Sequence, residues 1–339
     1  MRKIGVLNLV SVLVLLFAAK VASAQKYTVT DLGTLPGGNS SVAYKVNDLS
    51  QVAGNSTLPG NAYGHAFIYQ NGTLTDVGTL SGGWSVAFQV NASGEAVGYA
   101  PLSTGNDRAF TFSNGQITAL PTLGGGFSDG YAINDFGQVV GASATSTGDT
   151  HPFLFSNGQM IDLGTLGSPP GPEYWNSAQG INNPGQVVGY SYTATGGFFG
   201  FLWTNGKMKN LGALGGSLSE AWAINDASQI TGGAYLKNGV EHVFLFSKGK
   251  MIDVDGRTGF SNSIGWAINK FGTVVGRFDV ASGTHAFISN GKLQDLNPLI
   301  PANSGWVLEE ARGINDSGQI SGYGTHNGEE RSFLLTPIH

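Results

Sequence analysis

The sequence has no cysteine in its 339 residues, and charged residues make up only 12% of it. A chain without cysteine forms no disulfides and no thiolate metal site, so its core and its backbone hydrogen bonds must hold the fold. Basic residues are also few, 17 against 22 acidic residues, which gives a net charge of −5. Nucleic acids and anionic membranes bind proteins through clustered basic charge, so we expect neither as a partner.

Long hydrophobic runs are missing too, apart from one at the N-terminus. Two basic residues precede a mostly apolar run over residues 4–19, and small residues follow up to Ala24. This order is typical of a secretory signal peptide cleaved near Ala24. An uncleaved anchor is the alternative, but a spanning helix needs roughly 20 apolar residues. The sequence therefore predicts a signal peptide over residues 1–24 and an extracellular or periplasmic chain with no membrane span after cleavage.

Glycine, in contrast, is abundant, with 53 residues. Much of it belongs to a nine-residue pattern, INDFGQVVG at Ile133–Gly141, that recurs seven times at intervals of 43–48 residues. A fixed period of this length is typical of propellers, solenoids and other repeat architectures. The second position is always asparagine: Asn47, Asn91, Asn134, Asn182, Asn225, Asn269 and Asn315. The ninth is always glycine: Gly54, Gly98, Gly141, Gly189, Gly232, Gly276 and Gly322.

Each period predicts four short β-strands, as the third copy illustrates. Apolar residues alternate with others over Ser128–Asn134, Gln138–Ala144, His151–Ser156 and Gln159–Leu163, and such alternation is the pattern of a half-buried strand. An Asn-Asp-Phe-Gly turn joins the first two segments and a Ser-Asn-Gly turn joins the last two. Both turns are tight enough for antiparallel hairpins. We therefore expect an all-β fold built from four-stranded antiparallel sheets.

The two ends of the chain predict how these sheets are arranged. The last copy ends at His339, too soon for its fourth strand, while a spare fourth-strand sequence, Tyr27–Leu32, stands near the start. Pairing this segment with Arg331–Leu335 would build one sheet from both ends and close a ring. An open solenoid would instead need polar caps. We therefore predict one domain over residues 25–339, a seven-bladed β-propeller whose last blade is closed by the N-terminal strand.

In such a ring the first strand of each blade lies innermost. A small residue stands four positions before each asparagine, and we expect these side chains to face a crowded central axis. They are Ala43, Ala87, Gly130, Ala178, Ala221, Gly265 and Ala311. The variable loops between second and third strands lie on the face opposite the asparagine turns, with the crossovers between blades. We call this the loop face, and a rigid scaffold with varied loops usually binds through them.

The third strands share a motif that ends in phenylalanine. The seven are His65-Ala66-Phe67, Arg108-Ala109-Phe110, His151-Pro152-Phe153, Phe199-Gly200-Phe201, His242-Val243-Phe244, His285-Ala286-Phe287 and Arg331-Ser332-Phe333. Together with I-N-x-x-G-x-x-x-G and the D-L-G-T-L strand endings, they closely resemble the HAF family of probable extracellular repeats. The resemblance covers Gln25–Ile338. It implies an exported bacterial repeat protein and, because the family has no assigned activity, it implies no catalytic residue.

The repeated histidines, His65, His151, His242 and His285, are candidate metal ligands. Each belongs to a different blade, and equivalent positions of a ring are too far apart to share one ion at bond lengths of roughly 2 Å. We therefore interpret them as strand-end residues bonded to a neighbouring loop. The seven asparagines are likewise interpreted as turn residues, with a ring of their carbonyls around an axial water or ion as the alternative.

Three isolated motifs are weaker candidates for chemistry. Gly126–Gly130 matches G-x-S-x-G, but that motif works on a strand-to-helix turn and here leads into a strand. Asp253–Gly256 resembles a calcium loop, but Ile264 stands where glutamate is needed. The glutamate pairs 309–310 and 329–330 are interpreted as exposed charge, because adjacent carboxylates on a strand face opposite ways. With no cofactor motif or catalytic constellation, we predict no cofactor and no enzymatic activity.

Aromatic residues in the crossovers are the best ligand-binding candidates. They are Trp84, Tyr174, Trp175 and Trp306. Flat rings on the loop face could stack on sugars or peptides, and packing of the crossovers onto their blades is the alternative. Trp222 and Trp266, three residues before their asparagines, are predicted to pack between blades.

These observations leave three hypotheses. The first is a secreted, monomeric, non-enzymatic scaffold that binds a protein or glycan through its loop face. The second is an exported propeller enzyme of the hydrolase, lyase or lactonase type, with its site on the loop face at the axis. Such enzymes gather unlike polar residues at the axis, and this sequence repeats the same residues, which favours the first hypothesis. The third is a purely structural part of the cell envelope.

Overall fold

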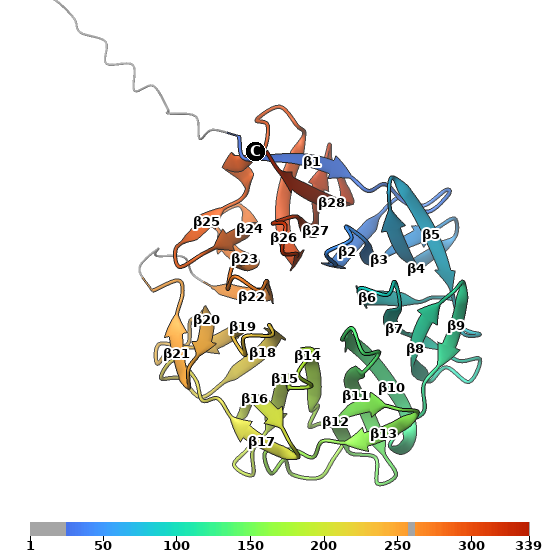
Figure 1. Cartoon of the computed structure of the whole chain (residues 1–339), viewed down its shortest axis with the longest axis vertical. Coiled ribbons are helices and arrows are strands. Elements are labelled where there is room, and N and C mark those ends of the chain that lie inside the picture. Colours follow the sequence, from blue (N-terminus) through green and yellow to red (C-terminus); the bar gives the residue numbers. More distant parts are fainter. Residues whose placement is uncertain (1–24, 257–261, 339) are drawn as a thin grey trace, which may run out of the picture.

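The computed structural model describes residues 25–256 and 262–338, so the predicted signal peptide lies outside the described residues. Within these ranges, β-strands form seven four-stranded antiparallel sheets that surround a central axis as blades (Figure 1). The prediction of a seven-bladed β-propeller is therefore confirmed. None of the described residues belongs to a helix long and apolar enough to cross a membrane.

Blades 1 to 6 each contain four consecutive strands, ordered from the axis outward. Blade 1 comprises β2 (Ser41–Val46), β3 (Val52–Leu58), β4 (Asn61–Gln70) and β5 (Thr73–Gly78). Blade 2 comprises β6 (Val86–Val90), β7 (Ala96–Pro101), β8 (Asp107–Ser113) and β9 (Gln116–Ala119). Blade 3 comprises β10 (Gly124–Ile133), β11 (Val139–Thr145), β12 (Thr150–Ser156) and β13 (Gln159–Asp162).

The next three blades repeat this order. Blade 4 comprises β14 (Ser177–Ile181), β15 (Val187–Tyr192), β16 (Phe198–Thr204) and β17 (Lys207–Asn210). Blade 5 comprises β18 (Ser219–Ile224), β19 (Ile230–Tyr235), β20 (Glu241–Ser247) and β21 (Lys250–Asp253). Blade 6 comprises β22 (Ser263–Ile268), β23 (Val274–Val280), β24 (Gly283–Ser289) and β25 (Leu293–Asp295), and the 3-10 turn η1 (Asn297–Leu299) follows it.

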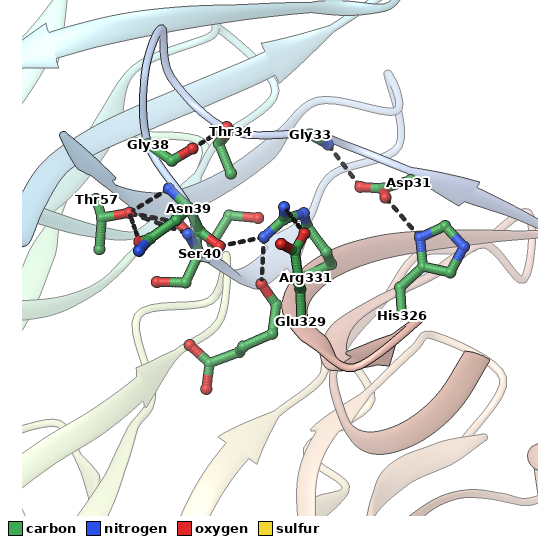
Figure 2. Close-up of polar contacts among 12 residues, drawn as sticks. Asp31, Gly33, Thr34, Gly38, Asn39, Ser40, Thr57, His326, Glu329 and Arg331 are labelled. Atoms are coloured by element: carbon green, nitrogen blue, oxygen red, sulfur yellow. Dashed lines mark hydrogen bonds and ion pairs between the residues drawn. The ribbon is translucent and has the colours of Figure 1, made fainter. Parts of the chain in front are cut away.

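Blade 7 is built from both ends of the chain, as the sequence predicted. Its inner strands are β26 (Trp306–Ile314), β27 (Ile320–His326) and β28 (Glu329–Pro337), and its outermost strand is β1 (Tyr27–Asp31). β1 pairs antiparallel with β28, from Tyr27 opposite Pro337 to Asp31 opposite Phe333. Figure 2 shows this junction, where Asp31 accepts hydrogen bonds from the Gly33 N–H and from His326 Nδ1 at 2.8 Å each. The ring is thus closed by backbone pairing.

The repeated glycine and phenylalanine form the core of every blade. Gly141 on β11 stands opposite Phe153 on β12. A Cβ at Gly141 would lie 1.8 Å from the Asp129 carbonyl oxygen and 2.9 Å from the Phe153 ring. The strands and the ring therefore approach closely only because this position has no side chain. The equivalent phenylalanines are all fully buried: Phe67, Phe110, Phe153, Phe201, Phe244, Phe287 and Phe333.

The small residues four positions before each asparagine do not face the axis, which corrects the prediction. They lie between blades, where a Cβ on Gly130 would come within 2.7 Å of Val97 in the preceding blade. A β-bulge follows directly, between Gly130 and Ala132, and every other first strand has an irregularity at the same place. Because a bulge breaks the two-residue alternation of a strand, it re-aims the side chains around it.

A circle of side-chain hydrogen bonds joins the seven blades on the turn face. Each repeated asparagine donates from Nδ2 to the backbone carbonyl of the asparagine in the next blade, at 2.9–3.3 Å, and Asn315 donates to Asn47. Each Oδ1 also accepts an N–H group of its own turn. The asparagines are therefore turn residues, as interpreted, that also hold neighbouring blades together, and this use of Oδ1 gives no support to an ion site.

A repeated serine also connects neighbouring blades. Ser128, the serine of the G-x-S-x-G match, is fully buried, and its Oγ accepts the Ala109 N–H of blade 2 at 3.2 Å. Backbone N–H groups of the preceding blade donate equivalent hydrogen bonds to the Oγ atoms of Ser85, Ser219, Ser263 and, from blade 7 to blade 1, Ser41. Ser128 lies within strand β10 and not on a strand-to-helix turn, so its role here is structural.

Candidate functional site

The residues three positions before each asparagine gather around the axis. With Lys45 and Tyr190 they line a cavity of about 220 Å³, which we call the aromatic cavity. In blade order they are Tyr44, Phe88, Tyr131, Gln179, Trp222, Trp266 and Arg312. Trp222 and Trp266 line the axis, which was not predicted, and they also contact each other across blades 5 and 6, as predicted. Because the first strands run toward the asparagine turns, this cavity lies on the loop-face side of those turns.

The aromatic rings contact one another around the cavity. Tyr44 and Phe88 have ring centroids 4.7 Å apart, and Phe88 and Tyr131 have centroids 5.3 Å apart. On the opposite side, the Trp222 and Trp266 centroids are 4.7 Å apart. All these side chains are partly exposed, as expected for walls of an open cavity. Rings that support one another edge to face hold their orientation and keep their faces ready to stack on a ligand.

Arg312 completes the ring between blades 6 and 1. Its guanidinium carbon lies 4.1 Å from the Trp266 ring centroid and 6.0 Å from that of Tyr44. Its Nε pairs with Glu310 Oε2 at 2.5 Å, and Arg277 pairs with the other Glu310 oxygen at 3.5 Å. Glu310 is only 8% exposed, so the prediction that this glutamate carries exposed surface charge is wrong. It is a buried counter-ion that holds two arginines near the axis.

Lys45 places a second cation in the wall of the aromatic cavity. Its Nζ donates to the Trp266 carbonyl oxygen at 2.6 Å, reaching from blade 1 to blade 6. Blade 7 has Gly313 at this level, where a Cβ would lie 2.8 Å from the Lys45 Cα, so the backbones of blades 7 and 1 approach closely here because this position has no side chain. Burial, with the positive charge of Arg312 as a second cause, lowers the pKa of Lys45 to about 7. Titratable groups with such shifts are frequent at functional sites.

Carboxylates flank the aromatic cavity on the loop-face side. Asp129 is 5% exposed, and its Oδ2 accepts a hydrogen bond from the Tyr131 hydroxyl at 3.3 Å. Burial, with the charge of Asp107 as a second cause, raises the pKa of Asp129 to about 7. Burial and the charge of Glu220 raise the pKa of Glu241 likewise to about 7. These groups are partly protonated near neutral pH, so they can donate as well as accept hydrogen bonds.

A second cavity, of about 260 Å³, opens on the turn face and is named here the asparagine mouth. It is lined by the repeated asparagines and by the residue after each: Asp48, Ala92, Asp135, Asn183, Asp226, Lys270 and Asp316. Most of these side chains accept a backbone N–H of the neighbouring blade, as Asp316 does from Lys270 at 3.0 Å. These side chains therefore mainly connect neighbouring blades through hydrogen bonds. Lys45, Gln179 and Trp222 line both cavities, so the two meet at the axis.

Two predicted candidates, Trp84 and Tyr174, begin chains of aromatic contacts that lead to the aromatic cavity. Trp84 lies edge-on to Tyr99 at 5.6 Å, and Tyr99 stacks on Phe88 of the cavity wall at 5.7 Å. Tyr174 contacts Tyr192 at 5.2 Å. This second chain continues through Phe198 and Tyr190 to Trp222, with centroid distances of 5.4, 6.0 and 5.9 Å. Both candidates therefore stand at the outer ends of aromatic paths into the axis.

The other two candidates are placed differently. Trp175 stacks on Phe127 with centroids 5.1 Å apart and planes at 12°. Trp306 stacks on His326 at 4.6 Å, also contacts Phe333 in the core of blade 7, and lines a separate groove beside β1. We call this the outer groove. The four candidates thus do not form one site, and their role in binding stays a prediction.

The repeated histidines each bind an aspartate at the end of the fourth strand. The pairs are His65–Asp76, His151–Asp162, His242–Asp253 and His285–Asp295, at 2.9–3.1 Å. In blade 7 the fourth-strand aspartate, Asp31, pairs instead with His326 at the end of the second strand. The bonds of the four repeated histidines therefore join the third strand of a blade to the end of its fourth strand, which is close to the interpretation from the sequence. Asp253, which belongs to the calcium-loop match, is one of the aspartate partners. The Asp162 bond raises the pKa of His151.

No protein-family model matches this sequence, and no curated protein sequence matches it. Solved structures similar to it include the β-propeller domain of the Trilobed protease from Pyrococcus furiosus. That domain is 9% identical with a TM-score of 0.60, and the match covers 93% of this chain and 98% of that one. Its topology is described as open velcro, whereas here β1 and β28 close the ring. At this identity the likeness shows the fold alone.

Two peptidases also resemble this chain over about half of their own length. The acylaminoacyl peptidase from Pyrococcus horikoshii is 11% identical with a TM-score of 0.50, and the match covers 84% of this chain and 50% of that one. A puromycin-hydrolyzing peptidase from Mycobacterium tuberculosis is 11% identical with a TM-score of 0.50, and the match covers 85% and 49%.

These comparisons contradict the prediction of a chain without enzymatic activity, because propellers of this fold occur in enzymes. The prediction also assumed that repeated residues line the axis, but the residues found there are unlike: aromatic rings, an amide and two cations. The repeated residues lie between blades and in turns instead. The absence of a catalytic motif therefore does not argue against chemistry at the axis.

Proposed function

We propose that this protein is exported and binds a glycan in its aromatic cavity, which ligands enter from the loop face. The gathering of unlike, partly exposed aromatic residues at the axis carries this proposal. The N-terminal sequence supports export, and membership of the HAF repeat family is a proposal that rests on the repeated motifs. The cavity volume, about 220 Å³, is below the range of about 300–1,000 Å³ typical of drug-sized ligands. A cavity of this size suits the terminal sugar of a glycan chain.

The chemistry of the walls favours a sugar over two other ligand classes. Aromatic cages often hold quaternary ammonium groups, but Lys45 and Arg312 would repel a cation here. A purely apolar ligand would leave the polar groups of the wall without partners, which costs free energy. A sugar offers an apolar ring face for stacking and hydroxyls for hydrogen bonds. The aromatic paths from Trp84 and Tyr174 would extend the same stacking surface toward the loop face.

Replacing Trp266 with alanine is expected to weaken glycan binding about tenfold or more, because it removes one wall of the cavity and the stacking partner of Arg312. A glycan array followed by calorimetry on the best ligand would measure this. Trp306→Ala is the matched control, since Trp306 lines the outer groove, and its affinity should stay within about twofold. Equal loss in both variants, or binding only to peptides, would contradict the proposal.

A second candidate function is a carbohydrate-active enzyme at the same axis. Asp129 and Lys45, both with a pKa of about 7, stand near the cavity, and groups poised near neutral pH serve as general acids and bases. Chromatography of the glycan recovered from the binding assay distinguishes the two functions. Intact glycan supports binding alone, and shortened glycan supports the enzyme.

A further inference from the structure

Lys45 is a cation without a carboxylate partner. Its one hydrogen bond to protein, among the residues that the structure describes, goes to the neutral carbonyl oxygen of Trp266. No carboxylate in the described ranges forms an ion pair with it, and the charge that acts with burial to lower its pKa is that of Arg312, also positive. An ammonium has three donors and is costly to bury alone. Two of its donors are thus available to a guest.

The positive charge of Arg312 is offset inside the protein, but that of Lys45 is not. Glu310 is the carboxylate that pairs with Arg312, and Arg277 shares it. Asp279 contacts Arg277 from the loop-face side at 3.5 Å. The cavity wall therefore retains an uncompensated positive charge where Lys45 and Arg312 meet. A guest with one negative charge would neutralise it.

The wall beside Lys45 also offers neutral donors. Trp266 Nε1 is buried and has no hydrogen-bond partner among the residues that the structure describes, and the amide of Gln179 lies on the same cavity. A buried donor without a partner costs free energy until a ligand satisfies it. The carboxylates that could repel an anion stand on the loop-face side, and burial raises the pKa of Asp129, Glu220 and Glu241. With pKa values of about 7, Asp129 and Glu241 carry only part of a negative charge near neutral pH.

We propose that the sugar held in the aromatic cavity is a uronic acid, whose carboxylate binds between Lys45 and Arg312 while its ring stacks on the tryptophans. This inference rests on the proposed glycan binding and narrows it to one class of sugar. Charge-assisted hydrogen bonds to a carboxylate are about twice as strong as neutral ones. A carboxylate also satisfies several donors at once.

Matched sugars test this inference separately from glycan binding itself. The probes are uronic-acid trisaccharides and their neutral methyl esters, which have the same rings and linkages, measured by calorimetry at pH 6. We expect the acid to bind at least about tenfold more tightly than its ester. Lys45→Met should reduce acid binding about tenfold and change ester binding less than about twofold, because methionine removes the charge and keeps an unbranched apolar stem.

Lys270→Met is the control for net charge, because Lys270 is 59% exposed at the asparagine mouth. It should leave the acid-to-ester ratio unchanged, and thermal melting of each variant checks that it is folded. Equal affinity for acid and ester, or an unchanged ratio in Lys45→Met, overturns this inference and leaves glycan binding standing. Preference for sulfated over uronic sugars also overturns it. Failure of all sugars to bind overturns both proposals.

Discussion

Replacing Gly141 with valine is expected to destabilise the protein by at least about 3 kcal/mol. A side chain at this position would overlap the Asp129 carbonyl oxygen and the Phe153 ring, at 1.8 and 2.9 Å from Cβ. β10 and β11 would have to separate, and the buried phenylalanine would have to leave its place. Urea unfolding followed by circular dichroism measures the loss.

Gly126→Ala in the same blade is the control for this result. The nearest atom to its Cβ would be Asn106 Nδ2 at 3.8 Å, an ordinary contact. We expect a change within about 0.5 kcal/mol. If Gly141→Val were as stable as this control, the close approach of ring and backbone would not explain why the ninth position of every repeat is glycine.

Removing residues 25–32 from a chain that begins at Gln25 is expected to abolish the stable monomer. This deletion removes β1, with the buried Tyr27 and the Asp31 partner of His326. It leaves the backbone of β28 unpaired at the edge of blade 7, and such an edge recruits other chains. Light scattering should detect oligomers or aggregates, and the melting temperature should fall by several degrees, as expected for a loss of about 3 kcal/mol or more in a chain of this length.

A synthetic peptide of residues 25–33 provides a rescue experiment. It should add to the edge of β28 as a fourth strand and restore both the monomer and the melting temperature. A peptide of the same composition in scrambled order should have no effect. A truncated chain that remained monomeric and melted like the full one would show that β1 does not close the ring.

The architecture could be predicted because the residues that fix it are the repeated ones. Asn134 and Gly141 recur in all seven copies, since each blade needs the same turn and the same close approach of strands. The spare strand Tyr27–Leu32 gave the phase of the repeat, and the pairing of β1 with β28 confirms it. Repetition therefore carried the information about strands, turns and closure.

The site could not be predicted in the same way, for two physical reasons. Regular strand alternation pointed the small residues toward the axis, but the bulge after Gly130 re-aims the chain and brings Tyr131 there. Lys45 reaches Trp266 across blade 7, a contact that no spacing in the sequence reveals. One signal was nevertheless present. The position three before each asparagine changes from blade to blade, from Gln179 to Arg312, although the small residue before it and the asparagine after it hardly change.

Repeated and unrepeated residues therefore have different roles in this fold. Repeated residues, such as Asn182 and Ser219, join neighbouring blades into a rigid ring. The unrepeated residues at the axis are not needed for these repeated inter-blade bonds. They can therefore differ from blade to blade and form one asymmetric cavity wall. Trp222 and Arg312 differ for this reason, although they occupy equivalent positions in their blades.

A crystal structure grown with the tightest-binding sugar tests most directly whether the aromatic cavity is the binding site. We predict a sugar ring stacked on Trp222 or Trp266, with its acidic group within hydrogen-bond distance of Lys45 Nζ. A sugar bound in the asparagine mouth, or in the outer groove beside Trp306, with none in the aromatic cavity, would contradict the account.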